Sequence, residues 1–271
     1  MGLQVSGRNQ FDVRMTESDQ PADYAEIFNA RGHLYNEAGS KTPGAREAER
    51  SALIERLDLA DGQVVCDVPA GGGYLADGIR AAFDPAIQVV CVEPAERFGS
   101  AIHADFTVRH DPLTEMSLPD AGMDRLGSLA GLHHIEDRVP VYREWFRVLK
   151  PGGRVAVADV QEGTGTAGFL NEFVDAHTPG SHDGMFFRPG DWERELTAVG
   201  FVDVEEELVE VPWRYPDENT MNDFCRTLFA VESADPAEVG LAIRKYLGCE
   251  TGPSGATMRW RLRYASARKP G

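Results

Sequence analysis

The feature that most constrains the fold is the alternation of short apolar runs with helical patterns between residues 64 and 160. The apolar runs read VVCDV, IQVVCVEP, FTVRH, DRLGSLAGL and GRVAVADV, and segments such as YLADGIRAAF separate them. Such alternation predicts a parallel sheet with helices on both faces. The runs are almost continuously apolar, which indicates strands that are buried on both sides. We therefore expect an α/β fold with a doubly wound, mostly parallel sheet.

The segments outside this core predict helical additions. Two helices are expected before it, over residues 23–35 and 45–57, and the second places Leu53 and Leu57 on one face. After the core we expect the helix GDWERELTAVGF, the strand VDVEEELVEV, the helical stretches ENTMNDFCRTLFAV and DPAEVGLAIRKYLG, and a last strand, ATMRWRLRYASA. Open α/β sheets bind ligands at the carboxyl ends of their strands, so these additions are expected to cap the site.

We accordingly predict one compact domain with three parts. Residues 1–60 are expected to form a leader and cap helices, residues 61–160 the cofactor-binding core, and residues 161–271 the second half of the sheet. In this last part, the cap insertions are expected at residues 161–188 and 212–256.

Composition narrows the class of partner. The chain has 271 residues, of which 42% are apolar, and its net charge of −17 repels nucleic-acid phosphates and anionic membranes. No apolar run is long enough for a membrane span, and residues 1–20 lack the pattern of a secretory signal or transit peptide. The four cysteines are scattered without a CxxC pair, which favours reduced packing residues. We expect a cytoplasmic protein that acts on a small molecule, while the sequence does not indicate its oligomeric state.

The stretch VVCDVPAGGGYLA, residues 64–76, predicts a cofactor loop. A strand that turns through glycines into a helix brings backbone N–H groups close to a ligand. Residues 71–76 fit G-x-G-x-x-A, and Glu93 follows Gly73 by 20 residues, which is a dinucleotide pattern. Asp67 favours S-adenosylmethionine instead, because a carboxylate repels a pyrophosphate but attracts the amino group of a methionine moiety. Glu93 can accept hydrogen bonds from ribose hydroxyls in either case.

With the later motifs LHHIEDR and VLKPGGRVAVADV, residues 64–160 resemble the class I S-adenosylmethionine-dependent methyltransferases. They are similar to the small-molecule enzymes of this class, which include those of ubiquinone and menaquinone biosynthesis. The resemblance implies a Rossmann-like sheet of seven strands, of which the last is antiparallel. It also implies cofactor-binding roles for Asp67, Gly71 and Gly73 in the loop, Glu93 at the ribose, Asp111 at the adenine, and Leu129 at the start of the segment up to His134 that lines the transfer site.

Pro69 departs from the family's pattern, because it occupies the position of the first glycine. Proline fixes φ near −65° and has no N–H to donate. We interpret the loop as a stiffened variant that still binds the cofactor. The turn is then expected over residues 70–73, with Gly72 supplying the freedom that Pro69 removes.

Two neighbouring histidines and the first helix add further candidates. Histidine side chains ordinarily titrate near neutrality, so we expect His133 or His134 to take a proton from an acceptor, with a slight preference for His134. In the first helix, aromatic residues at helical spacing are typical of a core. N-terminal helices of this superfamily commonly close over the cofactor, however, so Arg31 or Arg46 is expected at the methionine carboxylate and Tyr35 beside it.

The segment from residue 171 to residue 192 is the second place where substrate contacts are expected. It holds His177, His182 and Asp183, which suit a polar loop, a substrate contact or a metal site. The His-x4-His spacing lies in a Pro/Gly-rich loop and lacks the helical arrangement that places two imidazoles on one face, so we predict no metal. His177, His182 and Trp213 are the candidate substrate contacts, and Tyr215 and Phe224 could add to an apolar wall.

The predicted reaction is SN2 displacement of the methyl group from the sulfonium by a small-molecule acceptor. One alternative keeps the cofactor but changes the chemistry to cyclisation, decarboxylation or alkyl transfer. Another is an NAD-dependent oxidoreductase, since the glycine pattern is shared. Apolar cap residues would suit a hydrophobic or aromatic acceptor, whose nucleophilic atom the sequence does not identify.

Overall fold

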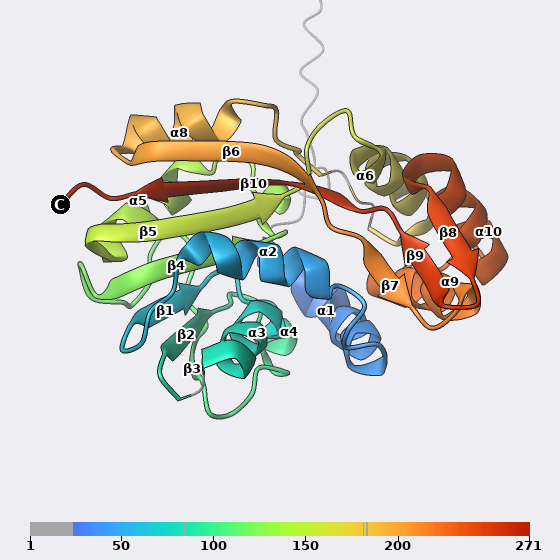
Figure 1. Cartoon of the computed structure of the whole chain (residues 1–271), viewed down its shortest axis with the longest axis horizontal. Helices are drawn as coiled ribbons and strands as arrows, with labels where there is room; N and C mark the ends of the chain where they lie inside the picture. The colour runs from blue at the N-terminus through green and yellow to red at the C-terminus, as the bar shows by residue number, and fades with distance from the viewer. Residues whose placement is uncertain (1–23, 84, 181, 183) are drawn as a thin grey trace, which may run out of the picture.

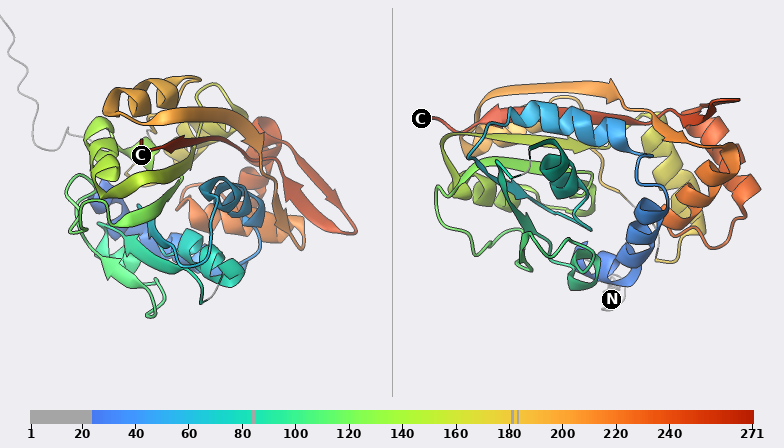
Figure 2. Two further views of the ribbon diagram at one scale, coloured as in Figure 1. Left: turned by 60° about the vertical axis from the view of Figure 1, so that its left-hand side comes forward. Right: turned by 60° about the horizontal axis from the view of Figure 1, so that its bottom comes forward.

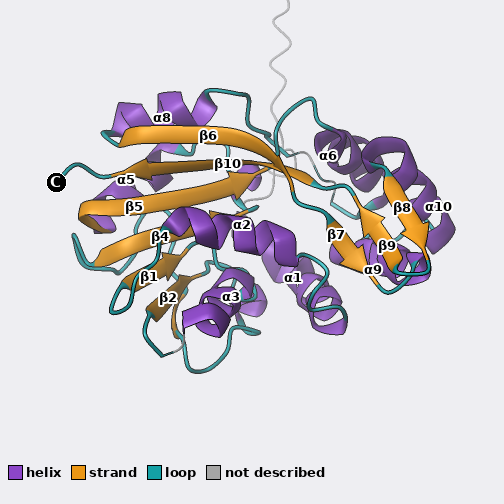
Figure 3. Ribbon diagram, in the orientation of Figure 1, coloured by secondary structure: helices purple, strands orange, loops and turns teal. Residues whose placement is uncertain are grey.

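The computed structural model describes residues 24–83, 85–180, 182 and 184–271 (Figures 1 and 3). The elements up to residue 159 are α1 (Tyr24–Lys41), α2 (Glu47–Leu57), β1 (Val64–Asp67), α3 (Tyr74–Phe83), β2 (Gln88–Val92), α4 (Glu96–Gly99), β3 (Thr107–Arg109), β4 (Met123–Leu129), the 3₁₀ turn η2 (Leu132–His134), α5 (Val139–Val148) and β5 (Leu149–Asp159). The later elements are α6 (Gly165–Gly168), the π-helical η3 (Phe169–Val174), α7 (Asp175–His177), α8 (Asp191–Val199), β6 (Val202–Glu210), β7 (Trp213–Tyr215), α9 (Glu218–Leu228), α10 (Pro236–Ala242), the π-helical η4 (Ile243–Leu247), β8 (Cys249–Gly252), β9 (Gly255–Met258) and β10 (Arg261–Arg268).

The core is a seven-stranded sheet in the order β3-β2-β1-β4-β5-β10-β6. The pairs from β3 to β5 are parallel, whereas β10 lies between β5 and β6 and runs antiparallel to both. This confirms the expected mostly parallel sheet of seven strands with an antiparallel last strand.

Side chains on successive residues of the central strands enter different hydrophobic clusters. In β5, Ala156 and Ala158 belong to the cluster that includes α2 and α3, and Val155 and Val157 belong to the one that includes α5 and α8. Because side chains alternate along a strand, a strand that is apolar at every position is buried on both faces. The sheet is therefore covered by helices on both sides.

A smaller antiparallel sheet in the order β7-β9-β8 lies beside α9 and α10 and forms, with α6 and η3, a cap at one end of the core (Figures 1 and 2). The prediction of one continuous strand over residues 256–267 is wrong. Strand β9 pairs with β7 and β8 in the cap, and the chain then crosses through Arg259 and Trp260 into β10 of the core. The expected helices are present, because α9 is capped by Asp217 and α10 by a capping box of Asp235 and Glu238.

The described part of the chain holds all four cysteines as free thiols, and Cys66, Cys91 and Cys225 are buried. Their expected role as reduced packing residues agrees with this placement. Among the described residues, no helix combines the length and apolarity that crossing a membrane requires.

Candidate functional site

Polar side chains gather where the parallel strands end. Asp67 ends β1, Glu93 directly follows β2, and Asp159 ends β5, while η2 with His133 and His134 follows β4. Parallel neighbours end at one edge of a sheet, so the fold brings these groups together from distant parts of the sequence.

The three glycines of the loop are required for two different reasons. Two of them have a backbone conformation that favours glycine, and the third lies where a side chain would not fit. Gly71 and Gly73 have φ of 54° and 86°, the left-handed region that glycine adopts without a steric penalty. Gly72 lies against α1, where a Cβ would stand 2.0 Å from Asn36 Oδ1. The backbone freedom that was expected from Gly72 is thus supplied by Gly71 and Gly73. Gly72 instead leaves room for α1, which a side chain at this position would contact.

Pro69 connects this loop to the end of β4. The Val68–Pro69 peptide bond is cis. The ring lies so close to the next loop that a Cβ on Gly131 would stand 2.6 Å from Pro69 Cγ. Gly131 immediately precedes η2, so Pro69 supports the turn that carries His133 and His134.

Glu93 is buried and accepts three hydrogen bonds from protein donors. Its Oε2 accepts hydrogen bonds from the Tyr24 hydroxyl at 3.0 Å and the Gly71 N–H at 2.7 Å, and its Oε1 accepts one from the Ala95 N–H at 2.9 Å. Burial raises the pKa of Glu93 to about 7, although these hydrogen bonds act in the opposite direction. A ribose hydroxyl can donate to the remaining lone pair of this carboxylate or take the place of the Tyr24 hydroxyl.

The two predicted aspartates are placed differently. Asp67 is buried and lines the cleft beside the loop, and its Oδ2 accepts a hydrogen bond from the Ala76 N–H at 3.0 Å. Burial raises the pKa of Asp67 well above its usual value. Asp111 accepts hydrogen bonds from the Ser117 N–H and hydroxyl and is not among the described residues that line the cleft. In this structure Asp111 acts as a turn residue.

The cleft beside the loop has a volume of about 470 Å³. It is lined by Tyr24, Phe28, Tyr35, Arg46, Asp67, Pro69, Ala70, Gly71, Gly72, Tyr74, Leu75, Phe98, Leu129, Ala130 and Gly131. The structure thus gathers most of the predicted cofactor residues on one surface. Arg31 lies outside the cleft lining in the described part of the chain, whereas Arg46 is part of that lining.

A second chamber of about 550 Å³ adjoins the cleft. Its lining shares Phe28, Tyr35, Arg46 and Ala130 with the cleft. The rest of the lining consists of Arg31, His133, His134, Val160, Leu170, His182, Trp213, Leu228, Phe229 and Trp260. Three of these are aromatic residues of the cap: Trp213 and Phe229 stack with an interplanar angle of 10°, and Trp260 lies against both.

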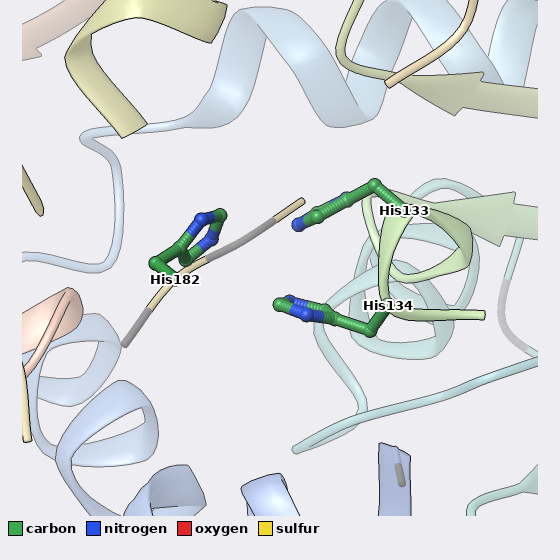
Figure 4. Close-up of side chains that lie close together, drawn as sticks. All are labelled: His133, His134 and His182. Atoms are coloured by element: carbon green, nitrogen blue, oxygen red, sulfur yellow. The ribbon is translucent and has the colours of Figure 1, made fainter. Parts of the chain in front are cut away.

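His133 is fixed by a buried carboxylate. Its Nδ1 lies 2.6 Å from Asp159 Oδ1, and Asp159 Oδ2 accepts from the backbone N–H groups of Leu132 and His133. When Nδ1 donates to a carboxylate, the lone pair is on Nε2 at the opposite side of the ring. Figure 4 shows the free end of the His133 ring directed toward His182.

The other predicted histidines separate into two groups. His134 and His182 line the chamber, and burial lowers the pKa of His134 well below its usual value and that of His182 to about 3, so both are neutral at physiological pH. His177 bonds to Ser233 at 2.8 Å and is not among the described chamber residues. Asp183 lies outside the described residues.

Arg46 holds the wall between the two cavities. It is buried, pairs with Glu49 and Tyr35, and stacks on Trp213 at 5.0 Å. Glu49 also accepts a hydrogen bond from Trp213 Nε1 at 2.9 Å. Trp213 is thus a wall residue of the chamber, while Tyr215 and Phe224, which were expected beside it, are not among the described chamber residues.

Comparisons with known proteins place this site in a family. Residues 66–157 match the family described as "Methyltransferase domain". This match agrees with the resemblance of the same stretch to the class I S-adenosylmethionine-dependent methyltransferases. The match covers the strand ends and the glycine loop, and it decides the cofactor in favour of S-adenosylmethionine over a dinucleotide.

Two relatives match part of this chain and are both named as methyltransferases. Methyltransferase GfsG of Streptomyces halstedii is 33% identical over 176 residues, which are 59% of this chain and 63% of that protein. The 27-O-demethylrifamycin SV methyltransferase of Amycolatopsis mediterranei is 34% identical over 40% of this chain and 42% of that protein. The chain therefore spans less than two thirds of each of these relatives.

A solved structure has the same fold as this chain. The phosphoethanolamine N-methyltransferase 2 of Haemonchus contortus, in complex with phosphomonomethylethanolamine and S-adenosylhomocysteine, superposes with a TM-score of 0.62 at 15% identity. It covers 92% of this chain and 61% of that one. The Rossmann-like class I architecture is confirmed.

The residues that line the cleft also fit S-adenosylmethionine. The cradle above the loop is tight, since a Cβ on Gly71 would lie 2.8 Å from Phe98 Cζ, and the cleft walls include the Asp67 carboxylate and aromatic rings from α1. Asp67 would hold the methionine amino group of the cofactor, and Glu93 would hold its ribose. The loop from Gly71 to Gly73 would lie against the side of the cofactor that faces the backbone.

Four contributors to the methyltransferase site were not predicted from the sequence. Asp159, Tyr24, Phe229 and Trp260 all contact candidate groups or line the cavities. Asp159 carried a usable signal, because it ends a buried strand in the same way as Asp67. The other three carried none, since an aromatic residue in a helix or turn is ordinarily part of a core.

Proposed function

We propose that the chain transfers the methyl group of S-adenosylmethionine to a small molecule and that His133 takes the acceptor's proton. The observation that carries this proposal is that His133, whose ring is held by Asp159, lines the second chamber, which adjoins the cofactor cleft. A base in the cavity next to the cofactor cleft suits a reaction between one ligand in each.

The chain's own residues supply positioning and proton transfer. When bound, S-adenosylmethionine supplies an electrophilic methyl group on its sulfonium. Asp159 holds the His133 ring and stabilises its charged form, and the Nε2 lone pair then accepts the proton from the acceptor's hydroxyl or amine. His134, preferred by a small margin from sequence, lacks a carboxylate among the hydrogen bonds of the described residues, so we assign the base to His133.

The chamber wall supports an acceptor with a hydrophobic or aromatic body. Trp213, Phe229 and Trp260 present stacked rings, while His133, His134 and His182 supply the polar side. Pockets of this kind bind by apolar contact and are oriented by a few polar groups. One relative, the 27-O-demethylrifamycin SV methyltransferase, is named for a small-molecule acceptor, which supports an acceptor that is a small molecule here as well.

We also propose that the chain works as one domain in the cytoplasm. In this view residues 61–160 bind the cofactor, while the insertions at residues 161–188 and 212–256 shape the acceptor chamber, together with the N-terminal helices. His182 and Trp213 are then substrate contacts, and His177 supports the loop from outside the chamber.

The test is product analysis combined with a His133→Gln variant. Purified protein is incubated with S-adenosylmethionine and a panel of hydroxylated aromatic and macrolide acceptors, and mass spectrometry follows S-adenosylhomocysteine and the methylated product. General-base catalysis is worth about 10²- to 10⁴-fold, so kcat of His133→Gln should fall by about 100-fold or more.

Affinity for S-adenosylhomocysteine should stay unchanged in the variant, and His177→Gln serves as the matched control. An unaltered kcat in His133→Gln would remove the base assignment. Cofactor consumption without a methylated acceptor would favour cyclisation, decarboxylation or alkyl transfer.

A further inference from the structure

Three imidazoles face one another across the acceptor chamber. His133 and His134 come from η2, and His182 comes from the loop after α7 (Figure 4). The ring centroids of His133 and His182 are 5.5 Å apart and those of His134 and His182 are 5.2 Å apart. One nitrogen from each ring lies within 4.8 Å of those of the other two.

Two of these rings are held in position by a hydrogen bond at Nδ1. His133 Nδ1 bonds to Asp159, and His182 Nδ1 lies 3.3 Å from Asn171 Oδ1. Metal-binding histidines characteristically donate their second N–H to a carboxylate or carbonyl oxygen, which fixes the tautomer and directs the other nitrogen to the metal. Asn171 lies on the π-helical η3, an irregularity that is frequent at functional sites.

We propose that His133, His134 and His182 form a binding site for a divalent transition-metal ion of the zinc, cobalt or nickel class. Three imidazole nitrogens at about 2.0–2.1 Å from the metal would leave a coordination position open toward the chamber. Two nitrogens bound to such an ion lie about 3.3 Å apart, so the three nitrogens must approach one another by up to about 1.5 Å, which rotations of the side chains can supply. Asp159 favours the added positive charge, and Arg31 in the chamber wall opposes it.

The sequence predicted no metal because it paired His177 with His182. In the structure these two residues are not paired with each other. His177 is hydrogen-bonded to Ser233, whereas His182 lies against His133 and His134, which come from a turn that is distant in sequence. The spacing rule for helical ligands does not apply to a site assembled from two separate loops.

Metal occupancy has a consequence that rests on the proposed function. The Nε2 lone pair of His133 can bind a metal or accept a proton, but not both. A bound ion would therefore suppress base-assisted methyl transfer, and a chelator would restore it.

The test uses Co²⁺ as the probe and the full chain without cofactor or acceptor, so its outcome does not depend on the proposed reaction. Visible absorption of tetrahedral Co²⁺ is followed in a titration at neutral pH. We expect one equivalent to bind, and His182→Gln and His134→Gln to weaken binding by about 100-fold or more. His177→Gln and His103→Gln, which alter half-buried or exposed histidines outside the chamber, should bind as the unaltered protein does.

Each variant is first checked for S-adenosylhomocysteine binding, so that a failure to fold is recognised. If His182→Gln does not fold, Asn171→Ala takes its place and should weaken Co²⁺ binding by about 10- to 100-fold. The absence of a tetrahedral Co²⁺ spectrum in the unaltered protein would overturn the proposal. Binding that the chamber variants leave unchanged would do the same.

Discussion

Glu93 and Tyr24 share one hydrogen bond at the position where a ribose is expected. The Tyr24 hydroxyl takes the place of a ligand donor, and together with the Gly71 and Ala95 N–H groups it completes the shell of a buried carboxyl. Replacing the side-chain hydroxyl by a ligand hydroxyl changes the free energy of this carboxyl little, because one hydrogen bond is exchanged for another. The site is in this respect organised before the ligand arrives.

Cofactor affinity should depend on pH through Glu93. The pKa of Glu93 is raised to about 7, so the free protein holds its proton below that pH, whereas ribose hydroxyls donate to the ionised form. Affinity should therefore be constant at higher pH and fall below about pH 7, by up to tenfold per pH unit. Calorimetric titration with S-adenosylhomocysteine across this range measures the effect.

The Glu93→Gln variant is the control for this dependence. It should bind more weakly at every pH and lose the change near pH 7. Burial also raises the pKa of Asp67, which interacts with Glu93, so a pH dependence that persists in Glu93→Gln would assign the proton to Asp67 instead.

At the scale of elements, α2 is joined to the cap strand β7 by a buried charged group. Glu49 on α2 pairs with Arg46 and accepts the Trp213 Nε1 hydrogen bond, and the backbone carbonyl of the same residue accepts from Tyr264. Removing one partner of a buried pair leaves the other charge unpaired. The helix, the cap and the last core strand thus depend on one position.

Glu49→Ala should lower the free energy of unfolding by about 3 kcal/mol, because Arg46 would lose its counter-ion in a buried setting. Denaturant titration followed by circular dichroism measures this change. Glu47→Ala, which breaks the exposed pair with Arg50 on the same helix, should cost less than about 1 kcal/mol. Equal losses in the two variants would contradict the assignment of Glu49 as the joint.

The elements also show which parts of the molecule can be predicted from sequence. The core strands could be predicted because their residues are apolar on both faces, and the glycine loop because its backbone demands glycine at residues 71 and 73. The cap sheet could not, since β7 and β9 are only three and four residues long and pair across 40 residues of chain or more. Each chamber histidine could be predicted as a candidate from the sequence. Their proximity could not, because it depends on contacts between segments that are far apart in the chain.

At the scale of the whole molecule, core and cap share one hydrophobic cluster. It runs from Leu53 and Ala156 of the core to Trp213, Phe224 and Met258 of the cap. A continuous cluster favours cooperative unfolding of the parts that it joins. This is the physical content of the prediction that the chain forms a single domain.

The four tryptophans allow a direct test of cooperativity. Trp145 and Trp192 lie on the α5–α8 side of the core, and Trp213 and Trp260 lie in the cap. A variant with phenylalanine at positions 145 and 192 reports on the cap, and one with phenylalanine at positions 213 and 260 reports on the core. Within each variant, fluorescence and far-UV circular dichroism should give the same denaturant midpoint, whereas separate midpoints would show that the cap unfolds independently.

Helix α1 contacts α4 of the core on one side and α9 of the cap on the other, and its residues Phe28 and Tyr35 line both cavities. A displacement of α1 that admits the larger ligand to the cleft therefore also disturbs the wall of the neighbouring chamber. For the proposed methyl transfer we therefore expect an ordered mechanism, in which the acceptor binds productively only after the cofactor has been enclosed.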